Sequence, residues 1–122
     1  MRTIFSLLYI QMETFPKEIN LKTCMQEIKK NQSTLILQTR KEFCEQINEA
    51  VKLCKCTVTL EYPVCLWAEN RILIARELFE RFGTINVRIG GQFPTTISIK
   101  DPEVIPKGIS SITIELFNVF AD

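Results

Sequence analysis

Apolar and polar positions change their spacing along the chain, and each change marks a predicted element. Residues 2–12 carry apolar side chains at odd and even positions, which is typical of a largely buried strand. Asn20 then stands where it can cap a short helix. One face of that helix is apolar and consists of Leu21, Cys24, Met25 and Ile28.

The middle of the chain predicts a strand, a helix and another strand. The apolar run 35–37 (Leu-Ile-Leu) is of strand type, and residues 39–42 (Thr-Arg-Lys-Glu) have the form of a capping box. We therefore expect a helix from Thr39 onward. Its buried face would consist of Phe43, Ile47, Ala50, Val51 and Cys54. Residues 57–62 alternate with a period of two, which predicts a strand with one buried face.

The second half of the chain predicts one helix followed by three strands. Residues 66–82 show the strongest helical period, and Gly83 follows where a left-handed C-terminal residue is favoured. Residues 84–89, 95–100 and 109–117 alternate or are β-branched, which indicates strands.

These elements predict an α/β to α+β fold in one globular domain that spans residues 1–122. The expected order is strand-helix-strand-helix-strand-helix-strand-strand-strand. We expect a single mixed sheet with helices packed on one or both faces. The early strands would be parallel or mixed, and the last three would form an antiparallel meander.

The charge balance excludes broad electrostatic binding. The net charge is +1, so no overall positive field favours nucleic acid or an anionic membrane, and we expect neither as a partner. The densest basic cluster, Arg40-Lys41, has Glu42 and Glu45 nearby and is interpreted as a solvated helix surface. No apolar stretch approaches the length of a membrane span, and no targeting signal is found, which favours the cytoplasm.

The absence of histidine removes the commonest general base and zinc ligand. The five cysteines are an odd number and fall on apolar faces, which predicts reduced, core-filling thiols. Cys54 and Cys56 are separated by one residue, whereas structural zinc sites usually separate their cysteines by two or more. We therefore expect no metal site and no cofactor.

Cys65 and Arg71 lie between a predicted strand and a predicted helix, with five residues between them. This segment resembles the phosphate loop of the low-molecular-weight cysteine-dependent phosphatases, which are related to thiol arsenate reductases. The resemblance implies a nucleophilic Cys65 thiolate and an oxyanion clamp at Arg71. The loop departs from the family pattern because it lacks glycine, has Trp67 where bare backbone should approach the phosphate, and adds the negative charge of Glu69.

A second resemblance covers residues 35–91, whose order of elements is similar to that of the histidine-containing phosphocarrier protein of bacterial sugar uptake. The place of the phosphoryl-accepting histidine holds residues 39–41 (Thr-Arg-Lys), which implies that this activity is absent. Farther along, Gly90 and Gly91 follow a strand and precede another, so they predict a hairpin turn instead of a phosphate loop. Phe93 at its tip would anchor a protein partner.

The leading hypothesis is a non-enzymatic protein-interaction module, such as an inhibitor, adaptor or assembly subunit, that binds a protein partner or associates with itself. Its surface would include the C-terminal strands, with Gly90, Gly91 and Phe93 as binding residues. The last strand would leave an apolar edge for strand addition or self-association, with Ile112, Ile114 and Leu116 on one side and Phe117 and Val119 nearby. One alternative is an oxyanion-binding enzyme of the phosphatase type. A second is a small domain that binds a nucleotide or phosphorylated ligand.

Overall fold

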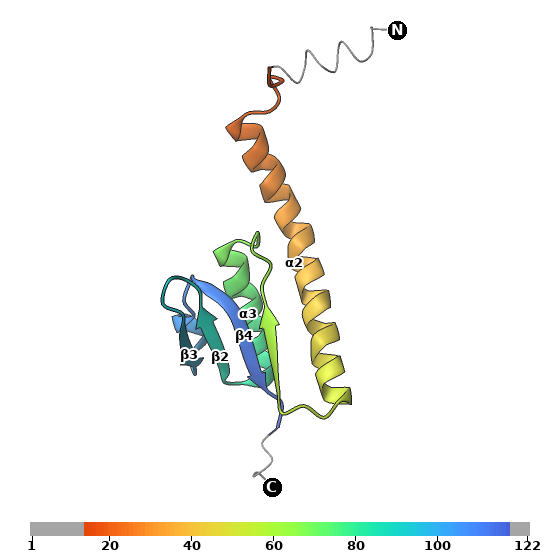
Figure 1. Ribbon diagram of the computed structural model, residues 1–122, viewed down its shortest axis with the longest axis vertical. Helices are drawn as coiled ribbons and strands as arrows, with labels where there is room; N and C mark the ends of the chain where they lie inside the picture. Colours follow the sequence, from red (N-terminus) through yellow and green to blue (C-terminus); the bar gives the residue numbers. More distant parts are fainter. Residues whose placement is uncertain (1–13, 118–122) are drawn as a thin grey trace. The chain divides into compact units, whose positions relative to one another are not determined.

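The computed structural model describes residues 14–117, which contain a four-stranded antiparallel sheet and two α-helices, a mixed α+β arrangement (Figure 1). The predicted first strand, residues 2–12, lies outside the described residues. The chain divides into two compact units, Met1–Ser33 and Thr34–Asp122. Helix α2 crosses from the first unit into the second, and the sheet and helix α3 belong to the second.

Helix α2 spans Leu21–Lys52 and has 32 residues. Two reciprocal hydrogen bonds define its start. The Thr23 amide donates to Asn20 Oδ1 at 3.0 Å, and the Asn20 amide donates to Thr23 Oγ1 at 3.3 Å, so both satisfy amides that an uncapped helix leaves open. The predicted cap at Asn20 is confirmed, but the helix is long instead of short.

The predicted strand at residues 35–37 and the predicted helix start at Thr39 are both wrong, because α2 continues through them. The Thr39 hydroxyl donates to the Leu35 carbonyl one turn earlier, at 2.7 Å, instead of capping a new helix. Three consecutive apolar residues are too few to show a period of 2 or of 3.6, so they fit a strand and a buried helix turn equally well.

Helix α2 ends with a residue in the left-handed conformation. Cys54 has a φ of 55°, and the Lys55 amide donates back to the Ala50 carbonyl at 2.9 Å. Cys54 therefore does not lie on the buried helix face as predicted, and both it and Val51 are exposed. Phe43 and Ala50 are buried as expected.

Strand β1 (Thr57–Glu61) and helix α3 (Ala68–Phe82) agree with the predictions for residues 57–62 and 66–82. Exposed and buried side chains alternate along β1. Gly83 ends α3 with a φ of 76°, and its amide donates to the Phe79 carbonyl at 2.8 Å. The predicted glycine end with a positive φ is confirmed, although its ψ of −140° differs from that of a left-handed helical residue.

The three predicted C-terminal strands are also confirmed as elements. They are β2 (Ile85–Ile89), β3 (Thr95–Ile99) and β4 (Ile109–Glu115), with a 3-10 turn, η1 (Pro102–Val104), before β4. Strands β2 and β3 form an antiparallel hairpin.

The order of strands in the sheet differs from the predicted meander. Strand β4 does not pair with β3 but lies between β1 and β2, which gives the order β1-β4-β2-β3 (Figure 1). Each of these pairings is antiparallel, so the expected parallel or mixed pairing is wrong in the described sheet. Three isoleucines of β4, Ile109, Ile112 and Ile114, are buried. In its central position the strand has a paired neighbour on each edge.

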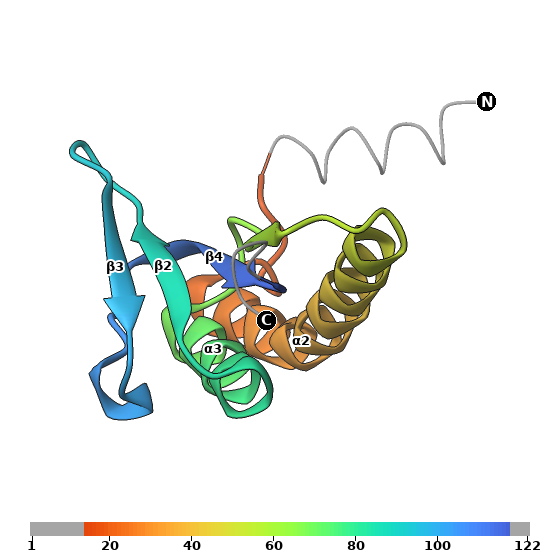
Figure 2. The ribbon, with the colours of Figure 1, turned by 90° about the horizontal axis from the view of Figure 1, so that it is seen from below.

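The core lies on one face of the sheet. Leu60 pairs with Ile112, and Ile112 pairs with Val87, and all three side chains are fully buried. Helix α3 contacts β4 and β2, and Phe43 and Ala50 of α2 join the same hydrophobic cluster (Figure 2). The opposite face is mostly polar and carries Thr57, Thr59, Glu61, Asn86, Arg88, Thr96, Ser98 and Thr113. This alternation of apolar and polar side chains is typical of an antiparallel sheet that has one face packed against the core and the other exposed to solvent.

Candidate functional site

Strand β3 forms one edge of the sheet. It pairs with β2 on one side, and among the described strands nothing pairs with its other side (Figures 1 and 2). Its sequence, Thr-Thr-Ile-Ser-Ile, contains no charge or proline, the residues that commonly blunt an edge strand. The strand therefore presents unpaired backbone donors and acceptors, and its first four side chains are exposed.

The turn that leads into β3 holds the predicted binding residues. The Gly90 amide donates to the Gly108 carbonyl at 3.0 Å, which ties the turn to the start of β4. Gly91 has a φ of 135°, a value that side-chain-bearing residues rarely adopt. Phe93 is 84% exposed, a large apolar ring in water beside the open edge. The structure thus places Gly90, Gly91 and Phe93 together on one hairpin.

The last strand does not offer the apolar edge that the sequence predicted. Ile112 and Ile114 are fully buried, and β4 has a strand on each side. That expectation is wrong because strand order depends on pairings between distant residues, which local patterns do not encode. The exposed C-terminal edge belongs to β3.

Arg71 lies in the first turns of α3 and directs its guanidinium at the backbone. Nε donates to the Leu66 carbonyl at 2.8 Å, and one terminal nitrogen donates to the Ile109 carbonyl at 2.7 Å. The other terminal nitrogen donates to the carbonyls of Pro63 and Val64, at 3.1 and 3.0 Å. Four of the five N–H groups that a guanidinium offers are therefore used.

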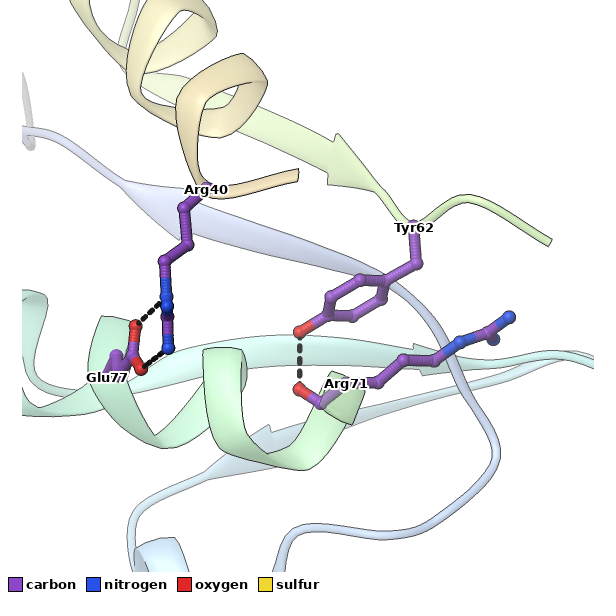
Figure 3. A network of polar contacts seen from close by, with 4 residues as sticks. All are labelled: Arg40, Tyr62, Arg71 and Glu77. Carbon is purple, nitrogen blue, oxygen red and sulfur yellow. Dashed lines mark hydrogen bonds and ion pairs between the residues drawn. The ribbon is translucent and has the colours of Figure 1, made fainter. Parts of the chain in front are cut away.

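Tyr62 holds Arg71 from the other side (Figure 3). The Arg71 guanidinium carbon lies 5.8 Å from the centre of the tyrosine ring, and the tyrosine hydroxyl donates to the Arg71 carbonyl at 2.7 Å. Burial raises the pKa of Tyr62 well above its usual value, although the nearby Arg71 charge acts in the opposite direction. The hydroxyl therefore stays protonated and remains a donor.

Arg71 thus fastens the loop between β1 and α3 to the start of β4, a role that the sequence pattern did not predict. No local signal identifies it, because its partners are carbonyls from two distant segments. Cys65 is exposed in the same loop. With the donors of Arg71 directed at carbonyls, this conformation shows no clamp aimed at an anion beside Cys65, and the enzyme alternative stays a prediction.

Arg40 of α2 and Glu77 of α3 form a two-pronged ion pair that the sequence pattern did not predict either (Figure 3). Nε of Arg40 donates to one carboxylate oxygen at 2.9 Å, and a terminal nitrogen donates to the other. The pair borders a groove of about 360 Å³ between the two helices, whose apolar wall includes Phe43, Ile74 and Leu78. Its side chains are more than a third exposed, so solvent screens the attraction and the ion pair contributes little to stability.

The cysteines are not core residues. Cys24, Cys44, Cys54, Cys56 and Cys65 are all exposed, so the expectation of core-filling thiols is wrong. Two of them, Cys54 and Cys56, lie in the turn after α2, where the apolar pattern no longer faces the core. Among residues 14–117, no group of three potential metal-binding side chains comes together.

Comparisons with protein-family models, with curated proteins and with solved structures found no match to this chain. No helix in the described part of the chain is long and apolar enough to cross a membrane.

Proposed function

We propose that this protein is a non-enzymatic interaction module that binds an extended segment of a partner along strand β3. The observation that carries the proposal is the open edge of β3 beside the exposed Phe93. An extended segment gains main-chain hydrogen bonds when it adds to such an edge, and an aromatic side chain at the end of the strand adds contact area.

The side chains of β3 suit this role. Four of its five residues are β-branched, the type that favours the extended backbone. Thr96 and Ser98 lie on the open polar face, where they can receive polar side chains of an added strand. Ile97 lies on the other face and is partly exposed, so it offers an apolar contact next to the core.

The experiment compares partner recovery from an extract of the cells that express this protein. Thr96→Lys places a charge on the open edge, and Phe93→Ser removes the aromatic ring. Thr96→Lys opposes strand addition with a charge, and Phe93→Ser removes an apolar contact. Because a change of about 1.5 kcal/mol in binding free energy lowers affinity about tenfold, we expect each variant to retain about a tenth or less of the partner that the unmodified protein retains. Val64→Ser is the matched control because Val64 is also an exposed apolar loop residue, and it should retain the partner.

Sedimentation velocity of the same four proteins tests self-association through the same edge. A second copy of the chain on β3 would give an oligomer in the unmodified protein that Thr96→Lys dissociates. Recovery of the same partners by Thr96→Lys, or a monomer without any partner, would contradict the proposal.

A further inference from the structure

The first turns of α2, residues 21–29, carry an apolar stripe that faces water. Leu21, Met25 and Ile28 are 76%, 57% and 47% exposed, and they lie at the four- and three-residue spacing that aligns side chains on one helix face. Three neighbouring large apolar residues on one face are unusual on a protein surface and mark an interaction site when they form a patch.

Two lysines lie on one flank of this stripe. Lys22 and Lys29 are about two turns apart and share the same side of the helix. Both lysines are exposed. A second copy packed antiparallel on this stripe would bring lysines toward lysines, whereas a helix with carboxylates beside its own apolar stripe would neutralise them.

We propose that the stripe of Leu21, Met25 and Ile28 docks an amphipathic helix of a partner protein whose apolar face is flanked by glutamate or aspartate. The carboxylates of the partner helix would lie at Lys22 and Lys29. This surface is separate from the β3 edge, and the two proposals stand or fall independently.

The test measures binding of two synthetic helical peptides to the full chain by fluorescence anisotropy. Both peptides have about 21 residues with leucines at alternating three- and four-residue spacing; one has glutamates on the flanks and the other has lysines. We expect the glutamate peptide to bind and the lysine peptide to bind at least about tenfold more weakly. Binding of the glutamate peptide should also weaken as salt is added.

Three variants locate the binding surface. Met25→Glu should weaken binding of the glutamate peptide at least about tenfold, because it places a like charge inside the stripe. Lys22→Glu combined with Lys29→Glu should reverse the preference toward the lysine peptide. Leu37→Glu is the matched control, since Leu37 is an exposed residue of α2 on a different face, and it should bind as the unmodified protein does. Circular dichroism checks that helix content is kept.

Several outcomes would overturn this proposal. Equal binding of both peptides, binding of neither, or insensitivity to Met25→Glu would each do so. A dimer that Met25→Glu dissociates would replace the partner helix with a second copy. Sedimentation with phosphatidylserine vesicles that Met25→Glu abolishes would replace it with a membrane surface. Variants of β3 should leave peptide binding unchanged, which separates this test from that of the strand edge.

Discussion

At the scale of single residues, the Arg71 side chain joins two separate segments of the fold through four hydrogen bonds to backbone carbonyls. One guanidinium satisfies carbonyls from the loop after β1 and from the start of β4, and the Tyr62 ring supports it. Removing this side chain takes a donor away from four carbonyls, of which the Pro63 carbonyl still accepts from the Leu66 amide. A partly buried carbonyl that is left without a donor costs more free energy than the average hydrogen bond gains.

Arg71→Ala should lower the free energy of unfolding by about 3 kcal/mol, because several partly buried carbonyls lose their donor. Arg71→Lys should recover only part of this loss, since an ammonium group lacks the planar fork that reaches separate carbonyls. Urea unfolding followed by circular dichroism measures both values. Arg76→Ala is the control, because Arg76 is an exposed arginine on the same helix whose side chain makes one long hydrogen bond, to the Pro102 carbonyl at 3.4 Å. This control should change stability by less than about 0.5 kcal/mol. A loss that small at Arg71 would show that its hydrogen bonds are dispensable.

At the scale of elements, α2 and α3 both end at a residue with a positive φ, but the two residue types differ. Gly83 ends α3 with a positive φ, which glycine adopts without a steric cost. Cys54 ends α2 in the same region of φ with a full side chain. The second end is therefore strained relative to the first.

Cys54→Gly should raise the free energy of unfolding by about 0.5–1 kcal/mol, because it relieves the left-handed strain after α2. The gain should appear as a higher urea midpoint with an unchanged slope. Cys54→Ala keeps the side-chain carbon that causes the strain and should bring no such gain. A gain of equal size in both variants would attribute the effect to loss of the thiol instead of the backbone.

The elements also show which parts of the fold can be predicted from sequence. Period-two alternation in residues 57–62, the helical period of residues 66–82 and the β-branched C-terminal segments each specify one structure. The run at residues 35–37 does not, because three apolar residues fit a strand or a helix turn. The wider pattern holds a clue, since the stripe from Leu21 to Ala50 keeps a helical spacing across that run.

Some features of the candidate site can likewise be predicted from the sequence, and others cannot. Turn chemistry alone is enough to predict that Gly90, Gly91 and Phe93 share a hairpin. The identity of the open edge cannot be predicted from local patterns, because it depends on β4 pairing with β1 and β2 across long stretches of chain. The role of Arg71 is hidden for the same reason: its partners are distant backbone groups that have no residue-type signature.

At the scale of the whole molecule, the exposure of all five cysteines makes thiol chemistry a direct test of the enzyme alternative. In the native protein we expect the five thiols to be alkylated at rates within about tenfold of one another, because none is shielded by the core. Peptide mass spectrometry after timed alkylation at several pH values measures each rate. If Cys65 reacts far faster than the other thiols at neutral pH, the result favours the phosphatase-type enzyme. If several thiols are protected from alkylation, the result contradicts their exposure in the structure.

The central position of β4 also has a consequence for how the protein is made. A ribosome releases β1, α3 and the β2–β3 hairpin before it releases the strand that joins them. Until Ile109–Glu115 has emerged, β1 has no strand to pair with and the hairpin has an open second edge. The sheet therefore closes in one late step. A nascent chain that stalls earlier leaves both edges of β1 and both edges of the hairpin unpaired, whereas the finished sheet leaves only the outer edges of β1 and β3.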